Sequence, residues 1–441
     1  MYLPEDVLEK AKEYNVKFVR LQFTDIFGLL KNIAVTVDDL KRALDGLLIF
    51  DSSVLEGAIK NRERDIVLKP DPSTFVVFPW RPREGAVARL ICDIANPDGT
   101  PYTACPRYVL RKVLAEASAM GYSTMAGTEV EFYLFHGDDK GNPTTDSHDR
   151  AGFCDLSPID MGENARRDMV LTLEEMGIDI GSSHHELGHG QHEIILKFDD
   201  VLAAADKFIT SKFVVRTIAQ RHGLHASFMP KPIISMPGSA LHCHISLYRL
   251  GNNAFFEPES PRQLSKDCLH FIAGILKHAE ANTAITNPLV NSYKRLIPSE
   301  LVPVYIAWSE HNRNSVIRIP AYRGQQTRVE VRNPDPSCNP YLAFAVMIKA
   351  GLEGIKNRIL PPEPVLDNIY QMDQEQRDAL QVRRLPHHLE AALAELAKDE
   401  VIRTTIGDYL FNRFYQGKLQ EWERYHNLIH PWELKEYLPV Y

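Results

Sequence analysis

Short apolar runs separated by turn residues mark the first hundred residues of this 441-residue chain. Runs of this kind, bounded by Gly, Pro, Asn and Asp, are typical of β-strands. The turn at 96–101 (NPDGTP) and Pro106 then interrupt the pattern. We therefore expect a small β-rich domain over residues 1–105. The clearest runs are 16–25 (VKFVRLQFTD), 47–53 (LLIFDSS), 75–80 (FVVFPW) and 87–94 (VARLICDI).

Beyond Pro106, the spacing of apolar residues changes from helical to alternating and back. The pattern predicts helices over 107–121, 162–177 and 265–282 and a strand over 123–135. The polar run 136–149 (HGDDKGNPTTDSHD) is predicted to be a loop. From about residue 360 the chain is predicted to be mostly helical. These mixed elements indicate a second domain, of α+β class, over residues 106–441.

Composition and charge narrow the class of protein. Hydrophobic residues make up 44% of the chain and charged residues 24%, as in ordinary globular proteins. The net charge of −8, without a sustained basic stretch, argues against a nucleic-acid partner. No apolar run is as long as a membrane span, and the first residues resemble neither a signal nor a transit peptide. We expect a cytoplasmic protein with no membrane partner and with reduced thiols, since its cysteines are widely spaced: Cys92, Cys105, Cys154, Cys243, Cys268 and Cys338.

Acidic residues on short, strand-like segments are the chief candidates for chemistry. Glu129 and Glu131 stand two apart in GTEVEFYLF, so their side chains project from the same face of a strand. Oxygen-rich ligation suits Mg²⁺ or Mn²⁺, whereas Zn²⁺ prefers more His or Cys. The acids exceed the need of one Mg²⁺, so two or three metals around a phosphorylated substrate fit better. The predicted ligands are Glu129, Glu131, Glu186, Glu193, His242 and Glu330.

The segment 184–193 (HHELGHGQHE) is rich in histidine and offers a zinc site as an alternative. It also holds two acids that suit a harder metal. We expect most of its histidines, namely His184, His185, His189 and His192, to be packing or supporting groups rather than ligands.

Five arginines crowd into 313–332: Arg313, Arg318, Arg323, Arg328 and Arg332. A solvated basic face is the ordinary interpretation. The interleaved Ile317, Ile319 and Val331 indicate half-buried strands instead, and a buried arginine needs an anionic partner. Since the chain has no GxxxxGK[ST] motif, we expect metals and these guanidinium groups to hold the phosphates.

Many ordered motifs resemble those of type I glutamine synthetases along nearly the whole chain. They include FVRLQFTDIFG, FDSSVLEG, HGLHASFMPKP, NSYKRL, AWSEHNRNSVIRIP, TRVEVRNPDPSCNPYLA and HPWELKEYLPVY. The resemblance implies a β-grasp-like amino-terminal domain and a catalytic domain whose curved antiparallel sheet, flanked by helices, forms a funnel. It also implies a homo-dodecamer of two hexameric rings, in which the Asp51 segment completes a neighbour's site.

The same resemblance implies a role for each candidate residue. One metal would be held by Glu131, Glu186 and Glu193, and the other by Glu129, His242 and Glu330. The nucleotide would meet Phe198, His244, Ser246 and Arg318. Glutamate would meet Gly238, Arg295, Arg313 and Arg332. Asp51, Arg313 and Arg318 would be catalytic: ATP phosphorylates the γ-carboxylate of glutamate, and an amine then displaces phosphate.

Departures from the family pattern gather at the amine site. A serine position holds Val54, a tyrosine position holds Phe153, and the flap glutamate position holds Leu301, with Glu300 one position away. Asp51 keeps its acid. Apolar replacements suit the alkyl part of an amine better than ammonium, which must exchange water for polar oxygens. Pro237, Ala240 and Gly181 also depart, in the glutamate and nucleotide segments.

Three functions are therefore weighed. The first is an ATP-dependent glutamate–amine ligase that favours a small alkylamine or polyamine over ammonia. The second is a glutamine synthetase with a variant flap. The third is a catalytically weak regulatory homologue, against which the complete set of acids and arginines argues. A coupled assay with a panel of amines separates them.

Overall fold

A small mixed sheet forms the amino-terminal part of the protein in the computed structural model, which describes residues 2–56 and 64–441. Its elements are α1 (Pro4–Glu13), β1 (Val16–Thr24), β2 (Leu30–Thr36), α2 (Leu40–Leu44), β3 (Ile49–Asp51), β4 (Asp65–Pro70), β5 (Val76–Val77) and β6 (Ala86–Ala95). The strand order is β2-β1-β6-β4-β3, with β5 beside β6. Alternation along β1 places Val19, Leu21 and Phe23 in the core, as the apolar run predicts.

A larger sheet of eleven strands carries the candidate chemistry. Its strands are β7 (Ser123–Gly137), β8 (Pro143–Ser147), β9 (Ile180–His185), β10 (Gln191–Asp200), β11 (Leu224–Ser227), β12 (Leu241–Arg249), β13 (Asn252–Asn253), β14 (Tyr305–Ser309), β15 (Ser315–Arg318), β16 (Val329–Val331) and β17 (Arg383–Arg384). The main path is β17-β14-β15-β16-β12-β7-β10-β9. Its neighbours are antiparallel except β14 and β15, which run parallel. The expected antiparallel sheet is confirmed, with that one exception.

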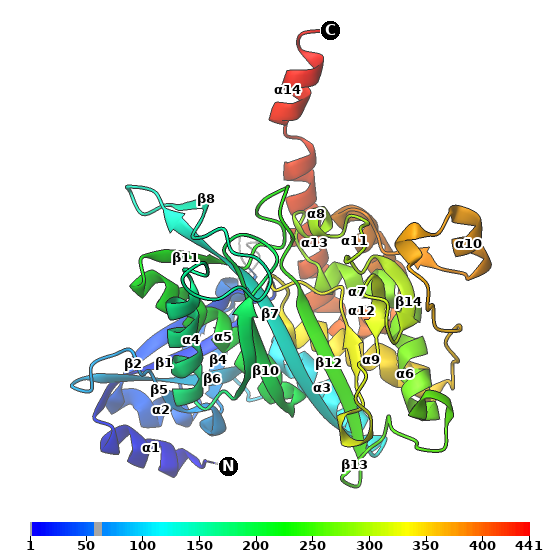
Figure 1. Ribbon diagram of the computed structural model, residues 1–441. Helices are drawn as coiled ribbons and strands as arrows, with labels where there is room; N and C mark the ends of the chain where they lie inside the picture. Colours follow the sequence, from blue (N-terminus) through cyan, green and yellow to red (C-terminus); the bar gives the residue numbers. More distant parts are fainter. Residues whose placement is uncertain (1, 57–63) are drawn as a thin grey trace.

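Helices flank the large sheet (Figure 1). They are α3 (Pro106–Ala119), α4 (Glu163–Glu175), α5 (Val201–Arg221), α6 (Lys266–Lys277), α7 (Ala279–Thr286), α8 (Ser292–Arg295), α9 (Pro340–Lys356), α10 (Gln374–Ala379), α11 (Leu389–Lys398), α12 (Glu400–Ile406), α13 (Asp408–His426) and α14 (Pro431–Tyr437). α5 packs against β7 and β10, and α9 packs against α3 and α6. A Cβ on Gly274 of α6 would lie 2.0 Å from the carbonyl oxygen of Ala350, so glycine permits the close approach of α6 and α9.

One guanidinium group joins the two parts of the chain. Arg107 at the start of α3 is buried and forms ion pairs with Asp71 (2.8 Å), Asp93 (3.1 Å) and Asp206 (2.8 Å). Asp71 and Asp93 belong to the small sheet region, whereas Asp206 lies on α5. The junction that follows the NPDGTP turn is therefore fixed by a buried charge network rather than left as a free linker.

Two predictions about individual elements are wrong. The segment 136–149 is not a plain loop, since β7 continues to Gly137 and β8 returns beside it as a hairpin. From His136 to Ser147 this hairpin is largely solvent-exposed, so hydrophobic alternation could not reveal it. The helix expected over 265–282 is two helices, α6 and α7, because the backbone departs from helical geometry at His278.

The carboxyl-terminal region is helical, as expected, and ends in a projection. α13 leads to α14, which extends away from the body of the molecule (Figure 1). Ile429, Trp432 and Leu438 on and around α14 are exposed. Within the described residues, no helix combines the length and the apolar character that a membrane crossing requires.

Candidate metal and nucleotide site

Strand register places five of the six predicted ligands on one face of the large sheet, and Glu186 directly follows β9. Glu131 of β7 lies directly opposite Glu193 of β10, and Glu129 lies opposite His242 of β12. Glu330 of β16 is paired with His244, two residues beyond His242 and on the same face of β12. Directly opposed carboxylates repel each other and destabilise a sheet. Their presence here indicates a cation-binding role.

The first predicted set of ligands, Glu131, Glu186 and Glu193, is divided between two candidate groups: His184, Glu186 and Glu193 form one, and Glu131, Glu193 and His242 form the other. His184 Nε2 lies 3.1 Å from Glu186 Oε1 and 3.7 Å from Glu193 Oε1. Burial and the charge of Glu186 raise the pKa of Glu131 to about 7. Burial and the charges of Glu131, Glu129 and Glu186 raise the pKa of Glu193 to about 10. A divalent cation among these oxygens would remove the repulsion and keep the carboxylates ionised.

The second group contains Glu129, His242 and Glu330. The Glu129 carboxylate is hydrogen-bonded to His242 Nδ1 and to His244 Nε2, each at 2.8 Å. Burial acts to raise the pKa of Glu129, but these two imidazoles lower it overall. Glu330 is fully buried.

The donor set fits hard divalent metals. Ligand atoms of Glu129, His242 and Glu330 lie within 4.8 Å of one another, as do those of Glu131, Glu193 and His242. His242 thus belongs to both sets, so adjacent metals could share this face. Carboxylate oxygens dominate, as Mg²⁺ and Mn²⁺ prefer.

The arginine-rich segment divides into two parts. Arg318 Nε lies 2.6 Å from Glu330 Oε2, and Arg332 Nη1 is bonded to Glu330 Oε1. By contrast, Arg323 pairs with Glu310 at 2.5 Å, away from the ligands. Arg313 is exposed, and its backbone oxygen accepts from Arg332. A wholly solvated basic face does not describe this segment, since Arg332 is buried beside a carboxylate.

Gly238 and Arg295, which are predicted to bind the glutamate substrate, lie together. A Cβ on Gly238 would lie 2.8 Å from Arg295 Cγ and 2.5 Å from the Pro230 oxygen, so only glycine fits. Arg295 is buried and donates to the carbonyl oxygens of Asn333 (2.7 Å) and Arg332 (3.2 Å). The guanidinium is thereby held in place before any substrate carboxylate arrives.

Gln191 is a connecting residue that the sequence interpretation missed. Its Nε2 donates to Glu131 Oε2 (3.1 Å) and to the Gly238 oxygen (3.2 Å). It links a predicted metal ligand to the predicted glutamate loop, and it is almost fully buried. Its position two residues before Glu193, on the same face of β10, is the pattern that could have revealed it.

The residues predicted to bind the nucleotide are only partly accessible to solvent. The ring of Phe198 covers Gly127, where a Cβ would lie 2.8 Å from Phe198 Cδ2, and its centroid is 6.2 Å from that of His244. Phe198 is exposed, as a stacking ring should be. The buried Ser246 hydroxyl instead donates to the Thr327 oxygen at 2.8 Å, which leaves it only acceptor capacity.

Each residue predicted for the amine pocket has contacts of its own, and within the described residues no hydrogen bond, ion pair or ring contact joins two of them except within the turn of Asp51 and Val54. Phe153 packs against His184, with ring centroids 5.4 Å apart. Leu301 is exposed, and Glu300 accepts a hydrogen bond from Gln371 Nε2 at 3.3 Å. Asp51 accepts from the Ser53 amide, in the turn that also holds Val54 (Ser52–Leu55). No hydrogen bond or ion pair among the described residues joins this turn to the metal ligands.

The remaining histidines support the ligand strands. The order His185-Glu186-Leu187-Gly188-His189 matches the HExxH zinc pattern in letters, but that pattern requires a helix. Here His185 ends a strand and is fully buried, with Nε2 3.0 Å from Asp149.

His192 belongs to the same buried cluster as His185. Arg166 Nη1 lies 2.8 Å from His192 Nδ1 and 2.7 Å from Asp160. The guanidinium already supplies the cation for this cluster, so zinc does not fit it.

Comparison with known proteins places the chain beside several related enzymes. A family model described as "Glutamine synthetase, catalytic domain" matches residues 103–437, and "Glutamine synthetase, beta-Grasp domain" matches residues 15–97. A glutamine synthetase of Clostridium saccharobutylicum is 50% identical over 440 residues, covering 100% of this chain and 99% of its own length. One of Thermus thermophilus is 50% identical over 444 residues, covering 100% of both. The solved structure titled "GmaS/ADP complex-Conformation 1" superposes with a TM-score of 0.89 at 28% identity, covering 99% of this chain and 100% of its own.

Proposed function

The chain belongs to the glutamine synthetase family and is an ATP-dependent ligase that forms C–N bonds, and on that premise we propose that it joins glutamate to an amine through a γ-glutamyl phosphate. The proposed acceptor is a small alkylamine or polyamine in preference to ammonia. The paired ligand sets and the buried arginines support the phosphoryl-transfer half of this proposal.

Charge complementarity assigns the proposed roles within the site. Mg²⁺ or Mn²⁺ held by Glu131, Glu186 and Glu193 and by Glu129, His242 and Glu330 would neutralise phosphate and carboxylate charge. Arg295 and Arg332 would hold the α-carboxylate of glutamate, with Gly238 at its amino end. Arg313 and Arg318 would balance the negative charge on the γ-phosphoryl group as it transfers. Phe198 and His244 would flank the nucleotide, with Ser246 contributing an acceptor.

The contact between Phe153 and His184 carries the proposed amine preference. An aromatic ring without a hydroxyl packs beside the imidazole that contacts Glu186 and Glu193. Leu301 adds hydrocarbon on the flap, and Val54 stands where the family has a serine. Each CH₂ of an amine that is buried against such groups contributes about 0.8 kcal/mol. Asp51 would accept the proton from the attacking amine.

Two observations support the amine branch and one supports the second candidate. The structures of GmaS fit the γ-glutamyl-amine branch of the family. The hydrogen bond between Glu300 and Gln371 keeps the adjacent acid engaged elsewhere. However, relatives at 50% identity are named glutamine synthetase, whereas GmaS is 28–29% identical. The second candidate is therefore glutamine synthetase proper, with ammonia as the acceptor. The third alternative, a catalytically weak regulatory homologue, is disfavoured by the complete set of acids and arginines.

We also propose that the protein assembles as a homo-dodecamer of two hexameric rings. The projecting α14 leaves Trp432 on the helix and Leu438 directly after it in water unless a partner covers them. Within the described residues, Asp51 and Val54 form no hydrogen bond or ion pair with the metal ligands, which fits a site completed by a neighbouring copy. Size-exclusion chromatography with light scattering tests the assembly, and an active monomer would disprove it.

A panel assay tests the acceptor. ADP formation is measured with glutamate, Mg²⁺ and either ammonia, methylamine, ethylamine or putrescine, and the amide product is identified by mass. The proposal requires a higher kcat/KM for at least one carbon-bearing amine than for ammonia. Glutamine formation as efficient as that of any other amide would instead establish the second candidate.

A further inference from the structure

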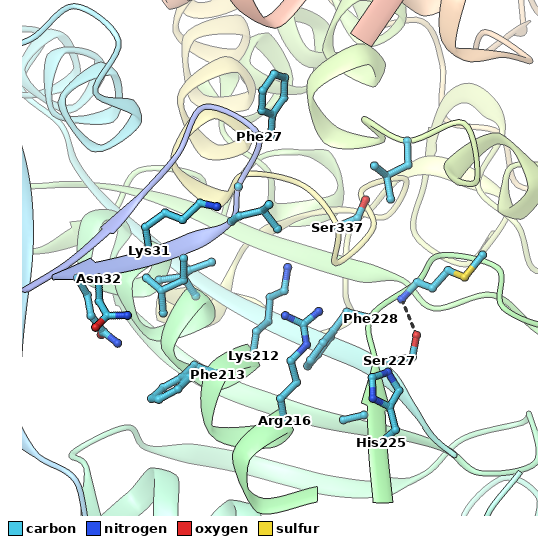
Figure 2. Close-up of a pocket in the computed structure, with 18 of the residues that line it drawn as sticks. Phe27, Lys31, Asn32, Lys212, Phe213, Arg216, His225, Ser227, Phe228 and Ser337 are labelled. Atoms are coloured by element: carbon cyan, nitrogen blue, oxygen red, sulfur yellow. Dashed lines mark hydrogen bonds between the residues drawn. The ribbon is translucent and has the colours of Figure 1, made fainter. Parts of the chain in front are cut away.

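The segment 228–240, described throughout by the structure, joins β11 to β12 without forming a helix or strand of its own, and it carries Gly238. Figure 2 shows where it begins: the Met229 amide donates to the Ser227 hydroxyl at 3.3 Å. A segment of this length without regular structure takes its shape from the side chains that bond its backbone. Those side chains therefore determine where Gly238 lies.

Asn291 anchors the first half of this segment. Its Oδ1 accepts from the Lys231 amide at 2.7 Å, and its Nδ2 donates to the Lys231 carbonyl oxygen at 3.0 Å. Asn291 stands at the N-cap position of α8, but within the described residues its side chain makes no capping hydrogen bond. Since α8 also carries Arg295, the segment is tied to the helix that positions this guanidinium.

Tyr133 and Gln191 anchor the second half, and both are almost completely buried. The Tyr133 hydroxyl donates to the Pro237 carbonyl oxygen at 2.6 Å, and Gln191 Nε2 donates to the Gly238 carbonyl oxygen at 3.2 Å. Pro237, which departs from the family pattern, has no N–H, so its carbonyl is its only polar backbone group. Side chains of β7 and β10 thus fix two successive carbonyl groups of the segment.

The hydrogen-bond partners of the Gln191 amide determine its orientation. Its Oε1 accepts from the Gly188 amide at 3.0 Å, and its Nε2 donates to Glu131 Oε2 at 3.1 Å as well as to Gly238. With oxygen and nitrogen exchanged, an NH₂ group would face the Gly188 N–H and an oxygen would face the Glu131 carboxylate. Glu131 Oε2 also accepts from the Ala240 amide at 2.8 Å. A predicted metal ligand and the predicted glutamate segment are therefore joined through one buried amide.

The turn between β9 and β10 leaves space for both side chains. A Cβ on Gly188 would lie 2.2 Å from the Tyr133 hydroxyl oxygen and 2.8 Å from Gln191 Oε1. Only glycine at this position leaves room for the two polar atoms. The arrangement is thus built into the backbone of the turn and does not depend on a chance contact between long side chains.

We propose that Tyr133 and Gln191 are positioning residues for glutamate, which hold the carbonyl groups of Pro237 and Gly238 so that the Gly238 oxygen receives the substrate's amino group. A carbonyl oxygen has two lone pairs, so the Gly238 oxygen keeps one for the substrate ammonium while it accepts from Gln191. Both residues act through the 237–240 backbone, without contact with the reacting atoms. The inference deepens the proposed function and rests on it, because it takes glutamate as the substrate that Gly238 meets.

Three variants of the full-length, assembled protein test the proposal. Tyr133→Phe removes one hydroxyl, and Gln191→Met removes the amide at nearly constant length. Tyr122→Phe is the matched control, because the hydroxyl of the buried Tyr122 donates to Asp267 at 2.7 Å, outside the predicted site. Calorimetry measures the binding of Mn²⁺ and, at saturating Mn²⁺, of ADP and of glutamate with ADP bound. Initial rates give kcat and both KM values, and thermal unfolding gives Tm.

Glutamate affinity should fall roughly tenfold in Gln191→Met and roughly threefold or more in Tyr133→Phe, since each loses a hydrogen bond that fixes the segment. The KM for glutamate should rise accordingly, while the KM for ATP, the affinity for ADP and kcat stay nearly constant. Mn²⁺ binding should weaken in Gln191→Met alone, because of the two residues only Gln191 contacts Glu131. Tyr122→Phe should lower Tm about as much as Tyr133→Phe and leave glutamate affinity unchanged.

Equal glutamate affinity in the wild type, Tyr133→Phe and Gln191→Met would overturn the proposal. An equal loss of glutamate affinity in Tyr122→Phe would also overturn it, because the effect would then be one of general stability. Tyr133→Phe decides the outcome if Gln191→Met does not assemble. A wild type that binds no glutamate would overturn the proposed function and this inference with it. Since the binding titrations contain no amine, the choice between an alkylamine and ammonia does not affect them.

Discussion

The ring of Phe153 meets the imidazole of His184 edge-on, with centroids 5.4 Å apart and planes at 85°. His184 in turn lies 3.1 Å from Glu186. A residue that departs from the family pattern is thus one side chain away from a predicted metal ligand. If the proposed amine pocket lies here, a change at Phe153 would alter the pocket through His184 and leave the carboxylate ligands unchanged.

Replacement of Leu301 by glutamate should change which amine the enzyme prefers as acceptor. Leu301→Glu restores a carboxylate for an ammonium-like acceptor, so kcat/KM for ammonia should rise and that for alkylamines should fall. One or two buried methylenes provide discrimination of roughly ten- to two-hundred-fold, which sets the scale of the change. Leu301→Gln, equal in size but uncharged, is the control. An unchanged amine profile in Leu301→Glu would remove Leu301 from the pocket.

Loss of one predicted metal ligand should abolish activity. Glu131→Ala and Glu330→Ala each leave a metal under-coordinated, so glutamate-dependent ADP formation should disappear in both. Calorimetric titration with Mn²⁺ should show weaker metal binding in the same variants. Glu259→Ala, at an exposed loop position, should behave as the wild type. Full turnover in both ligand variants would contradict the site.

Arg295 should act on glutamate binding more than on turnover. Arg295→Lys keeps the positive charge. It loses the planar guanidinium that the carbonyl oxygens of Asn333 and Arg332 hold in place. The KM for glutamate should increase roughly tenfold or more, while the KM for ATP stays nearly constant. Initial rates over a grid of both substrates measure this. An equal rise in both KM values would point to a general structural defect.

Stability should depend on the titration of Lys212. Its pKa is about 8 in the folded protein and about 10.4 when unfolded, so the unfolded chain binds more protons between these values. The free energy of unfolding should therefore rise with pH from about 8 to about 10 in the wild type relative to Lys212→Met. The gain is on the order of 2 kcal/mol. Urea titrations at pH 7, 8.5 and 10 measure it, with Lys207→Met as the control. Parallel pH profiles for wild type and Lys212→Met would refute it.

The main helices and strands could be predicted from the sequence, because the spacing of their apolar residues matches the side chains that are buried. The helix expected over 107–121 is α3 (Pro106–Ala119), and the strand expected over 123–135 lies within β7. The sequence did not predict the β7–β8 hairpin, because its pairing depends on backbone hydrogen bonds between polar, exposed segments. The sequence did not predict the break between α6 and α7 at His278, because apolar residues continue on both sides of it.

For the site, spacing along single strands was informative and contacts between distant segments were not. The two-residue spacing of Glu129 and Glu131 indicated a shared face, which their opposed partners His242 and Glu193 share. Nothing in the sequence showed that Glu300 engages Gln371, since the two are 71 residues apart. Such pairings follow from how the loops pack against each other in three dimensions.

The register of β7 also limits how the length of this chain can vary. Glu129 and Glu131 lie on the face of the sheet that carries the predicted metal ligands. Val130 and Phe132 point to the opposite face and are buried in the core. Insertion of one residue between Glu129 and Glu131 would turn one carboxylate into that apolar layer. The tip of the β7–β8 hairpin, around Asp139 and Gly141, has no such constraint because it lies in solvent. Lineages of this enzyme should therefore gain and lose residues at the tip while the span 123–133 keeps its count.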